Sequence, residues 1–337
     1  MITEAIEKVM AGNDLSSEEM IDTMNAIMAG GISEAQIAAF LTALKIKGEA
    51  VSEIYGAAKV MREKAEPIDV SDLYTIDTCG TGGGSAKTYN ISTAVSIIAA
   101  AAGISVAKHG NRSITSKCGA GDVLEELGIR IDLIPAQVES CIREVGIGFM
   151  FAPTFHKAMR FVGPTRKALG FRTVFNILGP LANPANANAQ VMGVSVPAFA
   201  KAMAEVLLKL GVERALVVSG ADGLDEISIA SETNIAEIKN GKIITYTISP
   251  KDFGMDFADL SELVGGYADE NARILLDVLG GHKGPKRDIL LLNAGAALYI
   301  GKKAKTLQEG VIMASEIIDS GKALEKLEEL KAYVQSI

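Results

Sequence analysis

The residues best suited to do chemistry stand in a glycine-rich loop. Four glycines occur among the five residues from Gly80 to Gly84, directly after a predicted strand at 73–76. Glycine lets a backbone turn freely and approach a ligand closely, so the amides of this loop can surround phosphate oxygens. A helix predicted from about residue 92 to 102 follows, and helix N-termini favour anions. The hydroxyls of Thr88, Ser92 and Thr93 add donors or metal ligands nearby. The loop therefore predicts a phosphate site, and a flexible surface turn is the alternative.

This loop matches neither of the common nucleotide-binding loops. A Walker loop needs Gly-Lys followed by Ser or Thr after its glycines, and that sequence is absent here. The glycines are also denser than in a dinucleotide fingerprint, and no acidic residue stands at the expected distance after a second strand.

A second cluster, Lys108 to Asp122, follows a predicted strand at 104–107. Because the carboxyl ends of parallel strands face a common crevice, we expect this loop to lie beside the glycine loop. Its cations Lys108, Arg112 and Lys117 stand among hydroxyl side chains, which is typical of phosphate binding. A solvated basic loop is the alternative.

A third cluster, Ser219 to Ser228, follows a predicted strand at 215–218. Its adjacent carboxylates, Asp225 and Glu226, are hard oxygen ligands suited to Mg²⁺, which often accompanies diphosphates. An Asp-Glu pair on a surface turn is the alternative, and the glycine loop makes the metal site the better interpretation.

The fourth cluster is the segment from Gly163 to Pro184, which is rich in glycine and proline. Arg166 can bind a substrate carboxylate with two hydrogen bonds, and the surrounding Pro and Gly residues predict a fixed, non-helical approach. A connector with ordinary surface arginines fits equally well. His109 and His156 are possible catalytic groups, although a lone histidine is more often structural.

The sequence predicts helices alone in the first part of the chain and alternating strands and helices in the rest. These elements must position the four clusters. Capping boxes at Ser16–Glu19 and Ser33–Gln36 begin two early helices, and Pro67 stops the helical run. Later strands are predicted at 104–107, 148–151, 215–218 and 243–247, with helices at 123–127, 136–145, 198–210, 271–279, 289–299 and 306–320. This predicts an α/β fold: a small all-helical N-terminal domain, 1–66 with 163–184 returning to it, and a large domain, 70–162 and 185–337, around a mostly parallel sheet.

Composition limits the partners. With 33 Lys and Arg against 41 Asp and Glu, the net charge is −8, which disfavours nucleic acid and anionic lipid. The partner is therefore expected to be a small molecule. Three cysteines form no spaced framework, and the longest apolar stretch, 94–106, is too short to span a bilayer. We expect a cytoplasmic protein.

Taken together and in order, these four motifs resemble the anthranilate phosphoribosyltransferase family over nearly the whole chain. The resemblance implies a nucleoside phosphorylase/phosphoribosyltransferase-like fold and a homodimer joined through the helical domain. It implies transfer of the phosphoribosyl group of phosphoribosyl pyrophosphate (PRPP) to the amine of anthranilate. The products would be N-(5-phosphoribosyl)anthranilate and pyrophosphate, in the second step of tryptophan biosynthesis from chorismate, with two Mg²⁺ per active site.

The resemblance also assigns roles to residues of this chain. Lys108 would stabilise the leaving diphosphate, and Arg166 would orient anthranilate. Ser92 and Glu226 would hold one Mg²⁺, and Asp225 with Glu226 the second. Anthranilate would lie near Gly80, His109, Asn111, His156, Arg166 and Pro180. PRPP would contact Gly80, Gly83, Gly84, Thr88, Asn90, Ile91, Ser92, Thr93, Lys108, His109, Gly110, Asn111, Arg112, Ser113, Ile114, Thr115, Ser116 and Ala120.

The chain departs from the family pattern at four positions. Gly84 stands where the family has an aspartate, Lys87 replaces a small residue, and Cys118 and Ala120 replace serines. These changes are expected to affect the binding of PRPP and Mg²⁺ more than the reaction. Two alternatives remain: a pyrimidine-nucleoside phosphorylase-like enzyme of the same fold, and a non-enzymatic relative that binds nucleic acid.

Overall fold

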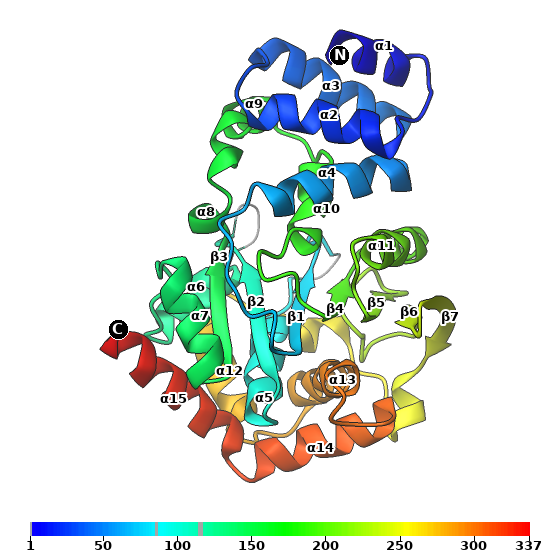
Figure 1. Ribbon diagram of the computed structural model, residues 1–337. Coiled ribbons are helices and arrows are strands. Elements are labelled where there is room, and N and C mark those ends of the chain that lie inside the picture. Colours follow the sequence, from blue (N-terminus) through cyan, green and yellow to red (C-terminus); the bar gives the residue numbers. More distant parts are fainter. Residues whose placement is uncertain (1, 85–86, 114–116) are drawn as a thin grey trace.

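The chain forms a helical unit that stands above a larger α/β unit (Figure 1). The structure, a computed structural model, describes residues 2–84, 87–113 and 117–337. The helical unit contains α1 (Ile2–Met10), α2 (Ser17–Met28), α3 (Glu34–Lys47) and α4 (Val51–Glu63). Both predicted capping boxes are confirmed, because Ser16 pairs with Glu19 and Ser33 with Gln36.

A buried carboxylate holds the helical unit together. Glu53 is completely buried at the start of α4. It accepts hydrogen bonds from the Leu15 amide (2.9 Å) and from the Lys47 ammonium group (2.9 Å). Because a buried charge needs such partners, this arrangement fixes the spacing of α2, α3 and α4.

The sheet of the α/β unit has seven strands in the order β3-β2-β1-β4-β5-β6-β7. The first five in this order are mutually parallel, whereas β6 and β7 run antiparallel as a hairpin. The mostly parallel sheet predicted from the sequence is therefore confirmed. The strands are β1 (Thr75–Gly80), β2 (Ser105–Gly110), β3 (Ile147–Phe151), β4 (Ala189–Gly193), β5 (Arg214–Gly220), β6 (Thr233–Lys239) and β7 (Lys242–Ile248).

Two strands, β4 and β6, were not predicted from the sequence. β4 is a five-residue, fully buried strand, and β6 forms the hairpin with β7 through Asn240 and Gly241, both at positive φ. A short buried strand carries no alternation of apolar and polar residues that would reveal it. β4 nevertheless lies beside β1 at the centre of the sheet, where the chain order reverses and a ligand crevice forms.

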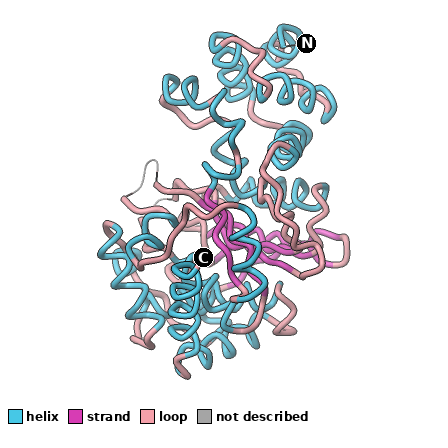
Figure 2. Tube along the Cα trace, turned by 60° about the vertical axis from the view of Figure 1, so that its left-hand side comes forward, coloured by secondary structure: helices cyan, strands magenta, loops and turns pink. Residues whose placement is uncertain are grey.

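Helices cover both faces of the sheet (Figures 1 and 2). Helices α5 and α13 pack on one face, and α11 packs on the other together with α4 of the helical unit. The helices of this unit are α5 (Ile91–Ala101), α6 (Ala120–Glu126), α7 (Pro135–Glu144), α8 (Ala152–Phe155), α11 (Pro197–Lys209), α12 (Ala268–Leu279), α13 (Pro285–Ile300), α14 (Leu307–Asp319) and α15 (Lys322–Ser336). Short 3₁₀ turns span Lys157–Phe161, Gly179–Leu181, Pro250–Phe253 and Leu260–Leu263.

The segment 163–184 contains two helices, so its predicted non-helical course was wrong. Helix α9 (Gly163–Leu169) includes Arg166, and α10 (Phe175–Leu178) follows it. Pro164 lies in the first turn of α9, where a helix needs no amide donor, and Gly170 ends the helix at φ +67°.

This segment packs on the helical unit, because α9 lies against α3. The same apolar cluster continues from α2–α4 through Val162, Phe175 and Leu181 into β4, β5 and α11. The boundary between the two predicted domains is thus crossed by one continuous core, and the division into 1–66 with 163–184 and the remainder stays a prediction.

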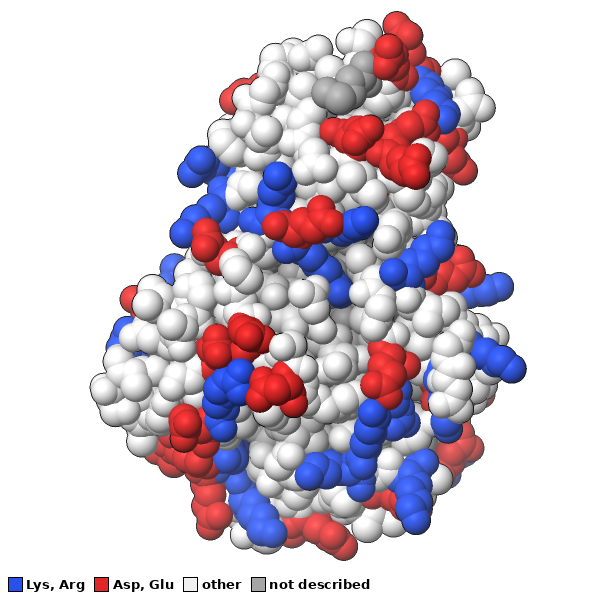
Figure 3. All heavy atoms as spheres, viewed as in Figure 1, with Lys and Arg blue, Asp and Glu red and all other residues white. Residues whose placement is uncertain are grey.

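Charged side chains of both signs cover the face of the molecule drawn in Figure 3. On the face drawn in Figure 3, basic and acidic side chains are interspersed rather than gathered into one basic tract. Within the described ranges, no helix combines the length and the apolar character needed to cross a membrane.

Packing between α13 and α14 provides a test of the core. A side chain at Gly295 would place its Cβ 2.7 Å from the Val311 amide nitrogen. We therefore expect Gly295→Ala to lower the free energy of unfolding by roughly 1–3 kcal/mol through overpacking, measured by urea denaturation. Gly163→Ala, where no atom lies within 4 Å of the added Cβ, is the control. Equal stabilities of the two variants would contradict this account.

Candidate active site

One cavity brings most of the predicted site residues together. It has a volume of about 710 Å³ and lies at the carboxyl ends of β1 and β2, below the segment that carries α8, α9 and α10. Both Gly82 and Lys108 line it, so the first two predicted loops do open onto one space. The predicted residues in its wall are Gly80, Gly83, Ser92, Lys108, His109, Gly110, Asn111, Arg112, Ser113, Ala120, His156, Arg166 and Pro180.

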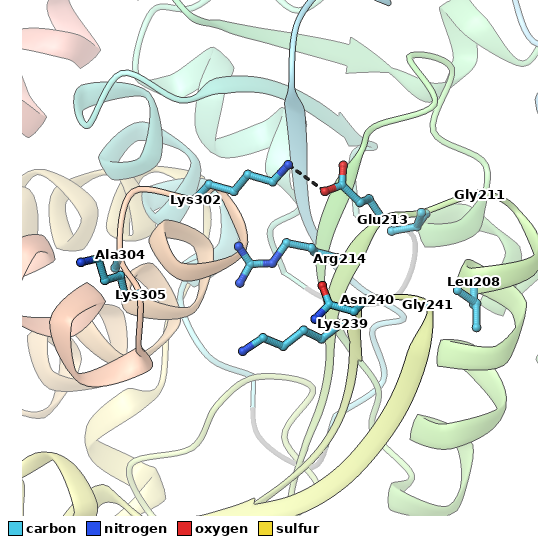
Figure 4. A pocket seen from close by; sticks show the side chains of 11 residues that line it. Leu208, Gly211, Glu213, Arg214, Lys239, Asn240, Gly241, Lys302, Ala304 and Lys305 are labelled. Atoms are coloured by element: carbon cyan, nitrogen blue, oxygen red, sulfur yellow. Dashed lines mark ion pairs between the residues drawn. The ribbon is translucent and has the colours of Figure 1, made fainter.

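A second hollow of about 600 Å³ lies near the start of β5 and the end of β6 (Figure 4). Its cations are partly engaged already, since Lys302 forms an ion pair with Glu213 at 2.7 Å and Arg214 lies over the Tyr299 ring. The amino end of β5 is the opposite end from the one that faces the glycine loop. Ligands of parallel α/β sheets bind at the carboxyl ends, so the first cavity is the candidate active site.

The glycine loop is fixed by bonds from its own backbone. The Thr81 amide donates to the Gly193 carbonyl (2.9 Å), and the Gly82 amide donates to Asp225 Oδ2 (2.8 Å). Gly82 and Gly83 adopt φ of +66° and +84°, which glycine accepts most readily. Among the described residues, the amides of Gly83 and Gly84 have no acceptor. Two donors therefore remain for a bound anion.

The acidic turn after β5 packs directly against this loop. A Cβ at Gly193 would overlap the backbone of Asp225, and one at Gly84 would lie 3.0 Å from Asp225 Oδ1. Asp225 thus occupies the space beside the position where the family has its loop aspartate. Burial raises the pKa of Asp225. The pKa of Glu226 rises well above its usual value through burial and then through the charge of Asp225, while Lys108 opposes the rise.

These two carboxylates fit a magnesium site of the kind completed by substrate phosphates. Mg²⁺ usually takes only one or two protein carboxylates and fills its other positions with water and phosphate oxygens. Within the part of the chain that the structure describes, no group of three or more His, Cys, Asp or Glu side chains could hold a metal alone. Asp225 and Glu226 therefore suit a metal that arrives with a diphosphate.

Lys108 lies at the base of the loop, with only 3% of its surface exposed. Its ammonium group donates to the Thr78 carbonyl (2.6 Å) and to Ser92 Oγ (3.3 Å). Burial lowers the pKa of Lys108, and the charge of Asp77 is the main opposing influence. Asp77 is also fully buried and accepts from the His109 amide (3.3 Å) and from Asn183 Nδ2 (2.8 Å). Lys108 Nζ is thereby held between the end of β1 and the helix that follows the glycine loop.

His109 and His156 form a buried pair in the cavity wall. Their Nε2 atoms lie 3.2 Å apart, and His109 Nδ1 lies 3.1 Å from the Gly179 carbonyl. Because a carbonyl only accepts, His109 carries its proton on Nδ1, and His156 must donate to His109 Nε2. Burial lowers the pKa of His109 to about 3 and that of His156 to about 4. Both imidazoles are therefore neutral at physiological pH.

Arg166 stands at the other end of the cavity with its guanidinium group available. It lies over the Phe175 ring at 5.4 Å, and no described carboxylate accepts a hydrogen bond from it. Burial lowers its pKa, although an arginine stays charged. The cavity wall includes the apolar side chains of Met61, Ala152, Pro153, Met159, Phe175, Pro180 and Ala182, together with the cations Lys157 and Arg160 on the segment that precedes α9. This end suits a flat apolar ring that carries a carboxylate.

The predicted trio of loop cations does not converge. Arg112 is bound to Glu125 by two hydrogen bonds (2.9 and 2.6 Å), and Lys117 lies over the Tyr267 ring. Arg112 does not join Lys108 beside the glycine loop, because its guanidinium group is bound to Glu125 on α6. The side chain of Asn90 is likewise occupied, accepting from Cys118 and Asn271.

Several other predicted residues lie beside the cavity rather than in its wall. Of the two carboxylates proposed as metal ligands, Asp225 contacts the glycine loop through its hydrogen bond from the Gly82 amide. The Thr93 Oγ1 atom is buried without a described hydrogen-bond partner. Ile114, Thr115 and Ser116 lie outside the described residues. The residues absent from the cavity wall are Gly84, Thr88, Asn90, Ile91, Thr93, Asp225 and Glu226.

Arg172 is the residue of this site that the sequence analysis left without a role. It donates from Nη1 to the Gly82 carbonyl (3.1 Å) and from Nη2 to the Thr81 carbonyl (3.2 Å). One arginine in a connecting segment looks like any surface cation, and only the fold places it against a loop 90 residues earlier in the chain.

The fold that carries this loop, turn and segment is shared with known proteins. Residues 73–324 match the α/β domain of a glycosyl transferase family, and residues 3–65 match the helical bundle domain of that family. A protein of Acetivibrio thermocellus named anthranilate phosphoribosyltransferase is 52% identical over 336 residues, covering 100% of this chain and 97% of the relative. This chain belongs to the anthranilate phosphoribosyltransferase family.

Solved structures of other anthranilate phosphoribosyltransferases agree with this membership. The Thermus thermophilus enzyme superposes with a TM-score of 0.93 at 43% identity, over 98% of this chain and 99% of that one. The Saccharomyces cerevisiae enzyme in complex with PRPP and Mg superposes with a TM-score of 0.92 at 30% identity, over 100% and 98% of the two chains. The family resemblance expected from the four motifs is confirmed.

The neutral histidine pair makes stability depend on pH. The folded-state pKa of His156 lies below the ordinary value of 6.5, so the unfolded chain binds the proton more readily. The stabilisation is full above pH 6.5 and falls as the pH drops toward about 4. Relative to His156→Gln, we expect the wild type to lose roughly 2 kcal/mol of unfolding free energy between pH 7 and pH 5.

The measurement is urea denaturation of both proteins across this pH range. His282→Gln is the matched control, because His282 is exposed and its removal should leave the pH profile of the wild type unchanged. Parallel profiles for the wild type and His156→Gln would show that the pair is not held neutral by the fold.

Proposed function

We propose that this member of the anthranilate phosphoribosyltransferase family transfers the phosphoribosyl group of PRPP to the amine of anthranilate and releases pyrophosphate. The observation that carries the proposal is that one cavity has two chemically different ends. One end offers free loop amides and a buried lysine for a diphosphate. The other offers an apolar wall and an available arginine for an aromatic carboxylate.

On the PRPP side, the leaving group gains negative charge as its bond to the ribose C1 breaks. The amides of Gly83 and Gly84 and the ammonium group of Lys108 are the donors that would stabilise this charge. Ser92, within 3.3 Å of Lys108, would add its hydroxyl. Residues Gly80, Thr88, Asn90 to Thr93, His109 to Ser116 and Ala120 complete the proposed PRPP site.

Two Mg²⁺ ions per active site are proposed, held by Ser92 with Glu226 and by Asp225 with Glu226. When bound, Mg²⁺ neutralises charge on the diphosphate. The chain's own contribution is to hold the two carboxylates against the loop, since Asp225 accepts from the Gly82 amide and thus cannot move independently of it.

On the anthranilate side, Arg166 would bind the carboxylate and the apolar wall would hold the ring, with Asn111, His109, His156, Gly80 and Pro180 nearby. The amine needs only to lie close to the ribose C1, because the sugar passes through a cation-like state and positioning dominates. The neutral imidazoles of His109 and His156 add no positive charge that would repel this centre.

We further propose that the protein is a homodimer joined through the helical unit and that it functions in the cytoplasm. Support for the dimer comes from two strongly exposed apolar side chains on that unit, Met10 (73%) and Ile46 (81%). Support for the location comes from three free cysteines that form no disulfide. Sedimentation of Ile46→Lys beside the wild type tests the first proposal.

Arg166→Ala should raise the apparent KM for anthranilate roughly 10- to 100-fold, because a charged hydrogen-bond pair is lost. The KM for PRPP should change little. Steady-state kinetics with each substrate varied in turn is the measurement, and Lys167→Ala, an exposed neighbour on α9, is the control. An unchanged KM for anthranilate would remove Arg166 from its proposed role.

Asp225→Asn with Glu226→Gln should shift the magnesium dependence to higher concentration and lower turnover by at least roughly 10-fold, because the carboxylate charge is gone. Glu232→Gln, an exposed neighbour, is the control. Magnesium titration of activity checks this, and wild-type behaviour of the double variant would exclude the pair from the metal site.

The products of the reaction distinguish the proposed transferase activity from that of a phosphorylase. Incubation with PRPP, Mg²⁺ and anthranilate should consume the fluorescence of anthranilate, whereas uridine with phosphate should give no free base. The reverse result would favour a phosphorylase of the same fold.

A further inference from the structure

We propose that Arg172 is a positioning residue that holds the glycine loop in the shape needed to receive the diphosphate of PRPP. The inference rests on the proposed function and adds a residue to its site. Arg172 donates two parallel hydrogen bonds, from Nη1 to the Gly82 carbonyl (3.1 Å) and from Nη2 to the Thr81 carbonyl (3.2 Å). Its planar guanidinium group presents two parallel donors in a fixed geometry that matches two successive carbonyls.

These two bonds determine where the loop amides point. In a trans peptide the carbonyl and the following N–H point in opposite directions, and the chain has no cis peptide among its described bonds. Fixing the Thr81 carbonyl therefore directs the Gly82 amide away from Arg172, onto Asp225. Fixing the Gly82 carbonyl directs the Gly83 amide away from Arg172 in the same manner, and this amide is one of the two free donors.

Such orientation matters because the loop has little rigidity of its own. Gly82 and Gly83 both adopt left-handed φ values, and glycine there can turn to many other conformations at low cost. Without the fork, the peptide planes at 81–82 and 82–83 would be held only through the Gly82–Asp225 bond. Binding a diphosphate would then require the loop to be ordered at that moment, at a cost in affinity.

The loop sequence leaves a space that the guanidinium group fills. A Cβ on Gly83 would coincide with the position of Arg172 Nη1, so any larger residue at 83 would displace the fork. A Cβ on Gly82 would meet nothing within 4 Å. The two glycines share the left-handed backbone but differ in this contact, which makes them a matched pair for an experiment.

Arg172 also connects the two ends of the cavity. It lies between Gly170, which ends α9, and α10, whose start is fixed by a 2.9 Å bond from the Thr173 amide to Asn176 Oδ1. The fork therefore joins the PRPP loop to the short segment that carries Arg166 and Phe175.

The first experiment separates PRPP binding from anthranilate binding. Arg172→Ala should raise the KM for PRPP about 10-fold, with the KM for anthranilate within about two-fold of the wild type. Calorimetric titration with PRPP and Mg²⁺ should show the same loss without turnover. Arg172→Lys keeps the charge but lacks the planar group that fixes two parallel donors, so on a logarithmic scale it should recover less than half of this loss.

The second experiment is a double-mutant cycle. In the Arg172 protein, Gly83→Ala should weaken PRPP binding more than Gly82→Ala, because it adds displacement of the fork to the shared backbone strain. In the Arg172→Ala background, the two alanine substitutions should weaken PRPP binding equally. Thermal unfolding of the wild type and of the five variants in this cycle controls for loss of folded protein.

The outcomes separate this inference from the function on which it rests. If the wild type does not convert PRPP and anthranilate, the proposed function fails. The positioning role is wrong if the wild type is active but, in the Arg172→Ala background, Gly83→Ala still weakens PRPP binding more than Gly82→Ala by the same factor as in the Arg172 protein. An equal rise in both KM values for Arg172→Ala would also overturn it, since a general structural defect would affect both substrates.

Discussion

The site depends on how closely two stretches of backbone approach each other at the centre of the sheet. The glycine loop after β1 and the acidic turn after β5 meet across β4, and Gly193 on β4 leaves no room for even a Cβ beside Asp225. The bond from the Gly82 amide to Asp225 then joins loop and turn. Because the carboxylate that would hold the metal also holds the loop, the amide donors and the metal ligands keep a fixed relation before any substrate binds.

Charge balance explains why the site is built around so many buried ionisable groups. Asp77, Lys108 and Glu226 lie close to one another, and burial alone would drive each toward its neutral form. Asp77 and Lys108 offset each other, whereas burial and the charge of Asp225 both oppose ionisation of Glu226, next to a loop that offers N–H donors. A metal bound to a diphosphate would suit both groups at once. The cation would bind the carboxylates, and the phosphate oxygens would accept hydrogen bonds from the amides.

The sequence predicted which loops lie close together better than it predicted how their side chains pair. Loops that follow strands, such as Gly80–Gly84 and the turn at Asp225, could be placed correctly because parallel strands end at a common edge. The pairing of Arg112 with Glu125 could not be foreseen, since both residues are polar and only the position of α6 brings them together. The same reason hid Arg172 and the buried β4, whose roles arise from contacts between residues far apart in the chain.

The segment 163–184 shows how one short connection can serve both substrates. Its α9 carries Arg166 at the apolar end of the cavity, and its Arg172 reaches the glycine loop at the other end. Val174, Phe175, Leu178 and Leu181 of the same segment are buried in the core shared with the helical unit. Because α9 also contacts α3, the coupling of the helical unit to both ends of the cavity runs through this one segment. The helical structure of this segment, which Pro164 permits and Gly170 ends, is what makes that coupling mechanically possible.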